Sequence, residues 1–311
     1  AGDKIDMKAD VAITLDDTSV GAGDLNTIDA ATSGNITASA ANTITGSVSE
    51  IIMAIQSAGI ITATDYDVTI SGDASTSQLG TIDGDTTGTV TADDVTDTLT
   101  NIASFNATAG TILQSATGTI TANGTGNSDS QSFSTVQKGM TINGLGGNDN
   151  ITGTDFADVI TGGTGIDSLF GGNGADTFVF SSGDSPTVLV STLSYDRVGD
   201  FDKASDKLDL SVAPVLGGAD IQAVTLGGLA GTASIDVAGK TSLAGDGLVD
   251  ASMAEVLAAL RSVVTDLGEI GFVEFDDGLN GNSTFLYQEN GGSSLDILLQ
   301  LFLECVHLYF Q

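Results

Sequence analysis

Polar and apolar residues alternate along most of the chain, but the form of the alternation changes twice. Between residues 11 and 118, short alternating runs are followed by apolar residues at helical spacing. Between residues 144 and 179 one apolar position recurs in every nonapeptide, and beyond residue 269 longer alternating runs return. Because alternation predicts strands and i, i+4, i+7 spacing predicts helices, the pattern predicts a mainly β chain with few helices.

The first stretch contains a diverged internal repeat. Residues 25–29 (LNTID) recur as residues 79–83 (LGTID). The same offset places the strand-like residues 36–38 on residues 90–92. Two copies at such a period are typical of stacked units. We therefore predict two mixed α/β repeat modules ahead of residue 136, the first over 1–65 and the second over 66–135.

Each module is expected to hold two strands followed by a helix. In the first module, Ser47 and Glu50 have the spacing of a capping box, and Gly59 is the expected helix stop. In the second module, Asp93 or Asp94 is the expected helix cap. No residues with catalytic spacing occur here, so we expect a structural spacer. The expected strands are 11–15, 35–38, 67–70 and 89–92, and the apolar helix residues of the second module are Val95, Leu99 and Ile102.

Residues 144–179 divide into four nonapeptides without remainder. Position one is always Gly, position six always Asp, and position eight always apolar. Glycine permits positive φ angles, and Asp supplies a hard carboxylate oxygen of the kind that Ca²⁺ prefers. Positions seven to nine form a short strand whose central side chain points inward. The repeats are GLGGNDNIT (144–152), GTDFADVIT (153–161), GGTGIDSLF (162–170) and GGNGADTFV (171–179).

This array resembles the RTX (repeat-in-toxin, hemolysin-type) calcium-binding nonapeptide family. The resemblance implies a calcium-binding parallel β-roll, or β-solenoid, which we place at residues 136–186. Successive turns of such a roll lie on opposite edges, so loops two nonapeptides apart face each other. That spacing pairs Asp149 with Asp167 and Asp158 with Asp176, and predicts two Ca²⁺ sites. Asp184, in a degenerate fifth turn, would add a third over the loop at 162–167.

Carboxylates and backbone carbonyls of the loops together would supply the six or more oxygens that calcium takes. The predicted ligand residues are Gly144, Gly146, Gly147, Asp149, Gly153, Asp155, Asp158, Gly162, Thr164, Gly165, Asp167, Gly171, Asn173, Gly174, Asp176 and Asp184.

The second repeat departs from the family pattern. Thr154, Asp155 and Phe156 occupy positions two to four, so this loop is either distorted or uses Asp155 as an extra ligand. Met140 stands where an upstream Asp would be, so no ligand is expected there. The alternative is a Gly- and Asp-rich turn ladder without an ion. It is disfavoured because four aspartates in register would repel one another without a cation.

The segments 196–201 and 206–211 resemble the region that follows RTX repeats in serralysin-type secreted proteases and alginate epimerase modules. In those families this region caps the roll and carries secretion information. We accordingly predict a β-rich C-terminal cap over 187–303, with one helix from Ser252. Asp200 and Asp209 are expected to cap turns rather than bind calcium. The antiparallel strands expected in this cap are 271–275, 283–287 and 295–299.

The chain has 311 residues, with 41 Asp and Glu against 8 Lys and Arg, so its formal net charge is −33. Such acidity excludes a nucleic-acid partner bound through phosphates. A hydrophobic fraction of 41% and a mean hydropathy of +0.21 still predict a buried core. The one cysteine, Cys305, cannot form an internal disulfide, which leaves bound metal as the expected staple.

The sequence contains no apolar run of membrane-spanning length, and its first residues do not form a cleavable signal. The closing residues 308–311 (LYFQ) match the end of an engineered protease-cleavage site. We therefore interpret residues 304–311 as a tail without functional weight, including the single histidine, His307.

No catalytic constellation accompanies the carboxylates, since no His-Glu-x-x-His helix and no Gly-x-Ser-x-Gly elbow occurs. We predict a protein that is not an enzyme: a secreted, calcium-binding structural or cell-surface protein of the sheath, surface-layer or adhesin type, exported by a type I system. Its partner would be another copy of the chain or a cell-surface or glycan ligand. The alternative is the non-catalytic C-terminal calcium-binding and secretion module of a larger type I-secreted enzyme or toxin.

Overall fold

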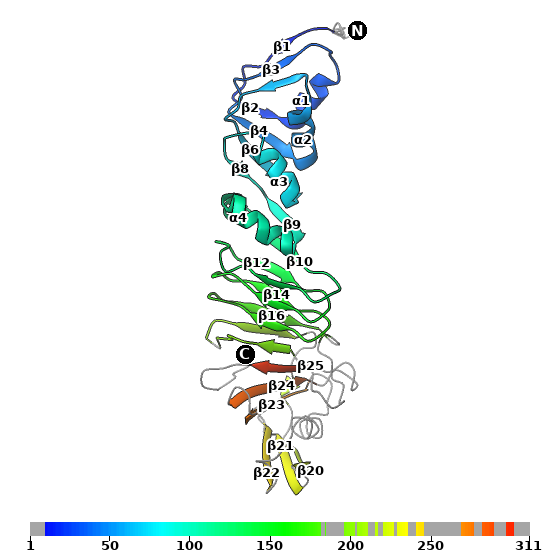
Figure 1. The fold of residues 1–311 in the computed structure, drawn as a ribbon, viewed down its shortest axis with the longest axis vertical. Coiled ribbons are helices and arrows are strands. Elements are labelled where there is room, and N and C mark those ends of the chain that lie inside the picture. The colour runs from blue at the N-terminus through cyan, green and yellow to red at the C-terminus, as the bar shows by residue number, and fades with distance from the viewer. Residues whose placement is uncertain are drawn as a thin grey trace. The chain divides into compact units, whose positions relative to one another are not determined.

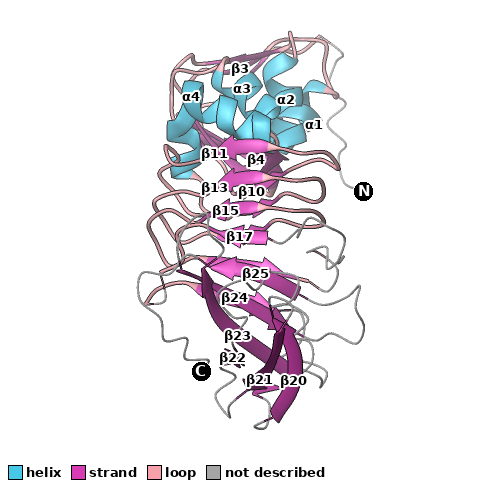
Figure 2. Ribbon diagram, turned by 60° about the horizontal axis from the view of Figure 1, so that its bottom comes forward, coloured by secondary structure: helices cyan, strands magenta, loops and turns pink. Residues whose placement is uncertain are grey.

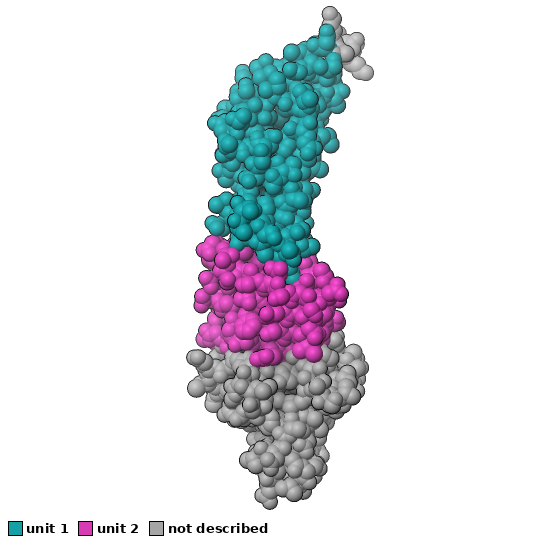
Figure 3. All heavy atoms as spheres, viewed as in Figure 1, with its two compact units in different colours: residues 1–122 teal, residues 123–311 magenta. Residues whose placement is uncertain are grey.

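The structure, a computed structural model, describes residues 10–181, 184, 196–202 and 204–210, together with the backbone of seven strands between residues 215 and 301. The chain divides into two compact units, residues 1–122 and 123–311 (Figure 3). Within the described residues it is mainly β, with parallel sheets and few helices, as the hydrophobic pattern predicts. The finer boundaries predicted from the sequence stay predictions.

Unit 1 repeats short strands and helices in parallel register. Strands β1, β3 and β5 form one sheet, β2, β4, β6 and β8 a second, and β7, β9 and β10 lie in strand order in a third. The elements are β1 (Ile13–Thr14), β2 (Ser19–Gly21), α1 (Ala22–Asp29), β3 (Ile36–Ala38), β4 (Thr43–Ser47), α2 (Val48–Gln56), β5 (Ile60–Thr62), β6 (Asp67–Ser71), β7 (Asp73–Ala74), α3 (Thr76–Asp83), β8 (Val90–Thr91), β9 (Asp94–Thr98), α4 (Leu99–Ser115) and β10 (Ile120–Asn123).

The strands of unit 1 repeat at a shorter period than the sequence repeat. Ile44 of β4 pairs with Val20 of β2 and with Val68 of β6, at equal spacing on either side. The longer offset of the sequence repeat instead relates α1 to α3, because Leu25 and Leu79 are buried on those two helices. Each predicted module therefore contains two repeats of strand and helix rather than one.

Two helix predictions had opposite outcomes. Ser47 and Glu50 form the predicted capping box of α2, which ends at Gln56, before Gly59. The predicted cap at Asp93 or Asp94 is wrong. Residues Asp94–Thr98 form β9, and α4 begins at Leu99, where the Thr98 hydroxyl accepts a hydrogen bond from Asn101 N at 3.1 Å.

Helices α1 and α3 were not predicted, although α3 has its own capping box between Ser75 and Gln78. Figure 1 shows α1, α2 and α3 stacked along one side of the strands of unit 1. Each of these helices buries apolar side chains completely: Leu25, Ile51, Leu79 and Ile82 are 0% exposed. The core of unit 1 thus lies between its helices and its parallel strands.

Unit 2 begins with strands that alternate between two sheets, and within the nonapeptide array every strand pair is parallel. One sheet contains β12, β14, β16 and β18, and the other runs β11, β13, β15, β17, β25, β24, β23, β19 (Figure 2). The strands are β11 (Ser130–Ser132), β12 (Met140–Asn143), β13 (Asn150–Thr152), β14 (Val159–Thr161), β15 (Ser168–Phe170), β16 (Thr177–Phe180), β17 (Asp196–Val198), β18 (Lys207–Leu210), β19 (Val215–Leu216), β23 (Glu269–Asp276), β24 (Asn282–Gln288) and β25 (Ile297–Leu301).

The nonapeptides set the register of these sheets. Ile160 pairs with Ile142 and Phe178, and Ile151 pairs with Leu169, so that every pair is two nonapeptides apart. All five side chains are 0% exposed. The predicted strands at positions seven to nine and the predicted inward position eight are both confirmed.

The three antiparallel strands expected near the C-terminus are confirmed as β23, β24 and β25, and β25 also pairs in parallel with β17. A second antiparallel sheet was not predicted and consists of β20 (Asp220–Leu226), β21 (Leu229–Ile235) and β22 (Thr241–Gly245). The expected helix from Ser252 and the tail 304–311 lie outside the described residues. Among the helices that the structure describes, none has the length and apolar character of a membrane span.

Candidate metal centre

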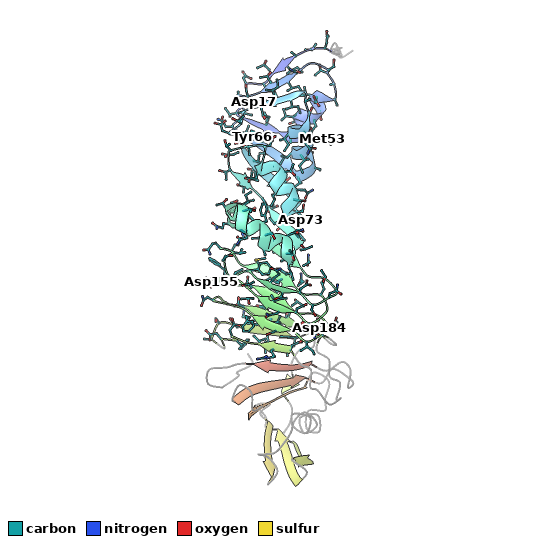
Figure 4. All side chains as sticks on the ribbon, viewed as in Figure 1. Asp17, Met53, Tyr66, Asp73, Asp155 and Asp184 are labelled. Atoms are coloured by element: carbon teal, nitrogen blue, oxygen red, sulfur yellow. The ribbon has the colours of Figure 1, made fainter. Side chains whose placement is uncertain are left out.

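The four position-six aspartates lie where loops enter strands, in two pairs on opposite edges of the array. Asp149 and Asp167 precede β13 and β15, and Asp158 and Asp176 precede β14 and β16. Ser168 N donates to the carbonyl oxygen of Asp149 at 2.8 Å, which ties the loop at 162–167 to the loop at 144–149. Figure 4 shows the two edges, one marked by Asp155 and the other by Asp184.

One oxygen of each aspartate links neighbouring coils. The Oδ1 atom of Asp167 accepts a hydrogen bond from Asp149 N at 2.8 Å, and Oδ1 of Asp176 accepts one from Asp158 N at 2.9 Å. The predicted pairing therefore brings Asp149 to Asp167 and Asp158 to Asp176. Each bond fixes the carboxylate so that its other oxygen has a defined direction.

The second oxygen is buried without a partner in three of the four. Among the described side chains, the Oδ2 atoms of Asp149, Asp167 and Asp176 have no hydrogen bond, although these residues are 2%, 1% and 0% exposed. An ionised carboxylate oxygen in that situation is strongly unfavourable unless a cation or donor reaches it. The arrangement thus has three oxygens that require a positive partner.

The position-one glycines leave room beside these oxygens. A Cβ on Gly144 would overlap both Oδ2 of Asp149 and the carbonyl oxygen of Gly162, one coil further on. The carboxylate oxygen and the carbonyl therefore converge on a space that only glycine keeps open. The Oδ2 atom of the position-six aspartate is approached in the same way by Gly153, Gly162 and Gly171.

The loops also require positive φ angles at positions two and four. Leu145 has φ 74° and is the only described residue other than glycine with positive φ. Such angles turn peptide groups so that carbonyl oxygens can line a loop. The glycines concerned are Gly147 (108°), Gly163 (94°), Gly165 (141°), Gly172 (94°) and Gly174 (139°).

Loops on the same edge pair through their backbones. Gly146 and Thr164 form a parallel bridge, in which Thr164 N donates to Leu145 O at 3.0 Å and Gly147 N to Thr164 O at 2.9 Å. A Cβ on Gly165 would overlap the carbonyl oxygen of Gly147. The predicted ligand residues of these two loops are thus brought together.

The second repeat is distorted, as its departure from the pattern suggested. Thr154 lacks positive φ, and its N–H donates to Oδ2 of Asp158 at 2.6 Å. Asp155 is exposed and accepts a hydrogen bond from Asn173 Nδ2 at 2.8 Å. Asp155 and Asn173 therefore meet at the outer side of the second edge.

Asp184 lies against the loop at 162–167, because Gly165 N donates to its carbonyl oxygen at 3.0 Å. Its Oδ2 atom accepts from Ser181 N at 2.6 Å. Asp184 and Asp167 repel each other, which helps to raise the pKa of Asp167. The structure thus brings this predicted residue to the first edge.

The aspartates of each edge, linked by hydrogen bonds from a backbone N–H to the next Oδ1, form a row, so the array has two Asp rows. Sequence reasoning missed three aspartates that extend these rows. Asp149 Oδ1 accepts from Asp129 N at 2.8 Å, Asp196 Oδ1 from Asp167 N at 2.8 Å, and Asp206 Oδ1 from Asp176 N at 3.0 Å. A signal was present, because the order Asp, any residue, apolar residue occurs at 196–198 and 206–208. The Asp200 carboxylate accepts from Gly171 N and Gly172 N, a turn-capping contact of the kind predicted for it.

The residues fit a calcium ion. No group of three or more His, Cys, Asp and Glu side chains in the described parts of the chain forms a metal cluster, so a cation here would draw on backbone carbonyls as well as carboxylates. Calcium accepts such mixed oxygen sets, whereas zinc and copper favour nitrogen and sulfur ligands. Unpartnered carboxylate oxygens beside glycine carbonyls are therefore the donor set of a hard cation.

Burial raises the pKa values of the position-six aspartates. The pKa of Asp167 rises to about 6 and that of Asp176 to about 7. Burial is the largest cause for both, and nearby carboxylates add to it. Burial also raises the pKa of Asp149 and Asp158. Without a cation, the folded array therefore holds protons on these carboxyl groups more strongly than the unfolded chain does.

This predicts that chelator-stripped protein gains structure on acidification. The folded pKa values of Asp167 and Asp176, about 6 and about 7, lie above the unfolded value of 3.8. At pH values between the unfolded and the folded pKa, the folded state therefore binds more protons than the unfolded state does. Stability without calcium should thus be greatest near pH 4 and be lost as the pH rises through 6 to 7. Far-UV circular dichroism should show more β signal at about pH 5 than at about pH 8.

A double variant, Asp167→Asn with Asp176→Asn, is the control for this pH response, because amides do not titrate. A response of unchanged size in the double variant would contradict the assignment to these two groups. In the presence of calcium the dependence should reverse, since protons compete with the cation for the same oxygens.

A comparison with protein families matches one part of the chain. The family model for the RTX calcium-binding nonapeptide repeat (4 copies) matches residues 152–185. RTX repeats indicate calcium binding and a secreted protein, and they imply a β-roll. The match does not extend over 187–303, so the serralysin-like character of that segment stays a prediction. No curated protein matches the chain.

Proposed function

We propose, from the RTX repeats that residues 152–185 carry, that the protein is a secreted structural or cell-surface protein whose array folds into a β-roll on binding extracellular calcium. The observation that carries the proposal is the set of three buried Oδ2 atoms without partners, on Asp149, Asp167 and Asp176. Two calcium ions would bind, one on each edge, with Asp184 placed to contribute to a third on the first edge.

The driving force follows from charge. A chain with net charge −33 repels itself, and this repulsion favours expanded conformations over the folded array. An ion that binds only the folded array stabilises it by about 2.7 kcal/mol when its concentration is about a hundred times the dissociation constant. Calcium would thus both neutralise the Asp rows and shift the folding equilibrium.

This coupling suits export. Low cytosolic calcium would leave the array unfolded, a state that a type I export channel can accept, and the millimolar calcium outside would then fold it. Support comes from the acidic rows and the family match, and the route itself is part of the proposal.

Unit 1 suits a spacer in such a protein. Among its described residues, no buried side-chain nitrogen or oxygen lacks a hydrogen-bond partner, so unit 1 requires no ion of its own. We also propose that the protein is not an enzyme, because its buried carboxylates are committed to loop positions that calcium explains.

The deciding experiment is a calcium titration of chelator-stripped protein, with magnesium as control. Far-UV circular dichroism should show a gain of β signal and light scattering a smaller particle, in calcium alone. Subsequent growth in particle size would support a surface-layer or sheath assembly, and a compact monomer would favour an adhesin. No change in either signal would overturn the proposed function.

A further inference from the structure

Six loops in the described part of unit 2 have an aspartate at position six and fall into two kinds, which differ in how that carboxylate is satisfied. We call 124–129, 153–158 and 201–206 the locked loops, and 144–149, 162–167 and 171–176 the open loops. In an open loop the Oδ2 atom of the aspartate has no partner, as described above for Asp149, Asp167 and Asp176. In a locked loop the residue at position two supplies that partner.

Thr154 shows how the lock works. Its N–H donates to Oδ2 of Asp158 at 2.6 Å, and its hydroxyl lies 3.0 Å from the same atom. The hydroxyl oxygen also accepts a hydrogen bond from Phe156 N at 3.0 Å, which holds positions two and four together. A single threonine thus satisfies the carboxylate and closes the loop.

Thr125 repeats this geometry at a distant position in the sequence. Its N–H and hydroxyl lie 2.7 Å and 3.0 Å from Oδ2 of Asp129, and its hydroxyl accepts from Asn127 N at 3.1 Å. The loop at 201–206 uses an aspartate in the same place, since Asp202 N donates to Oδ2 of Asp206 at 2.8 Å and Ala204 N donates to Asp202 Oδ1 at 2.9 Å.

Backbone conformation separates the two kinds. Leu145, Gly163 and Gly172, at position two of the open loops, all have positive φ. Neither Thr125 nor Thr154 does. Among the described residues, the N–H at position two of an open loop makes no hydrogen bond to Oδ2 of its position-six aspartate, and Gly172 N donates to Asp200 instead. In the locked loops Thr125 N and Thr154 N donate to Asp129 and Asp158.

We propose that the locked loops are independent of calcium, and that calcium binding is assigned to the three open loops. A carboxylate oxygen that already accepts a backbone N–H and a hydroxyl has its charge stabilised by those donors. It gains less from a cation than an unpartnered oxygen does. Thr125, Thr154 and Asp202 therefore act as internal substitutes for the ion.

The locked loops also have a pattern along the chain. One precedes the array, one follows it, and the third interrupts it in the second repeat. The Asp149 and Asp167 pair joins two open loops, whereas the Asp158 and Asp176 pair joins a locked loop to an open one. This inference rests on the proposed function and refines it: Asp176 is the calcium ligand of its pair, and Asp158 is a structural residue.

The test compares Asp158→Asn with Asp176→Asn in the full chain, by measuring the number of calcium ions bound at saturation and the thermal midpoint. In Asp158→Asn the amide oxygen can still accept the hydrogen bond from Met140 N, and in Asp176→Asn it can still accept the one from Asp158 N. The amide nitrogen then replaces Oδ2 in both variants. Asp176→Asn should reduce the number of ions bound. Asp158→Asn should leave that number unchanged and lower the thermal midpoint, because its amide faces the N–H of Thr154.

Loss of a calcium ion from Asp158→Asn, or no loss from Asp176→Asn, would overturn the inference. If Asp158→Asn does not fold, Thr154→Ser provides the second variant. This variant keeps the hydroxyl group, so the protein should bind the same number of calcium ions as the parent. A lower number would contradict the proposal that the residue at position 154 satisfies Asp158 in place of calcium. These outcomes are distinct from failure of the proposed function, in which the parent chain itself binds no calcium.

Discussion

Replacing Asp167 by asparagine should remove a large part of the stabilisation that calcium gives to the edge of the array that holds Asp149 and Asp167. Asp167 belongs to the pair in which the Oδ2 atoms of both carboxylates are buried without a partner. Its Oδ1 atom accepts a hydrogen bond from Asp149 N, and the variant would still have to satisfy that N–H. The amide nitrogen would therefore occupy the place of Oδ2, where it cannot bind a cation. Loss of one charged ligand should weaken calcium binding by about tenfold or more, equivalent to at least about 1.4 kcal/mol of the calcium-dependent free energy of unfolding.

The effect should change sign when calcium is removed. In chelator the parent array holds a buried carboxylate whose pKa is raised to about 6 by burial, and a neutral amide is less unfavourable in the same place. The variant should thus be at least as stable as the parent at neutral pH without calcium. Chemical denaturation followed by circular dichroism, with and without calcium, measures both free energies.

Asp17→Asn is the matched control, because Asp17 is an exposed aspartate of unit 1 (Figure 4). It removes the same formal charge without touching the array. Equal losses in Asp17→Asn and Asp167→Asn would mean that calcium acts by general screening, and would contradict the site.

Replacing Gly144 by alanine should destabilise the calcium-bound array by about 1–3 kcal/mol, the usual range for overpacking. The added Cβ would overlap Oδ2 of Asp149 and the carbonyl oxygen of Gly162. The first is a carboxylate oxygen fixed by the Asp row, and the second is backbone, so neither can move freely. Both are in the proposed calcium ligand set, so the calcium affinity should fall together with the stability.

Gly126→Ala is the control for this substitution. Gly126 also lies in a six-residue loop of unit 2, but a Cβ there meets nothing within 4 Å and its φ is not positive. Thermal unfolding in saturating calcium should therefore be nearly unchanged. If both alanine variants behave alike, the space beside Gly144 is not the one that calcium requires.

The nonapeptide period determined more about this protein than any other feature of the sequence. An apolar residue in every nonapeptide fixes four strands, and two repeats per coil fix the register that pairs Ile160 with Phe178 and Asp149 with Asp167. The prediction succeeded because each repeat uses the same local physics: a turn that glycine permits, and a strand that buries one side chain.

The period also explains what sequence reasoning missed in the rows. Asp129, Asp196 and Asp206 stand outside the nonapeptide register of Asp149, Asp167 and Asp176, although hydrogen bonds place them in the same rows. Insertions in the loops change the spacing along the chain but not the pairing of strands, so only the folded chain shows the equivalence.

The sequence alone thus determined the strands of the array, its inward-facing residues and the class of ion that its aspartates suit. Tertiary structure decided which of those aspartates remain unsatisfied. The difference between Asp158 and Asp176 coincides with the φ angle of the residue at position two, and it consists in the donors that reach Oδ2 of Asp158 but not Oδ2 of Asp176. The conformation of each loop is determined by its packing on the neighbouring loop of the same edge. The backbone N–H and carbonyl groups of the two loops must hydrogen-bond to each other, and this pairing exists only in the folded chain.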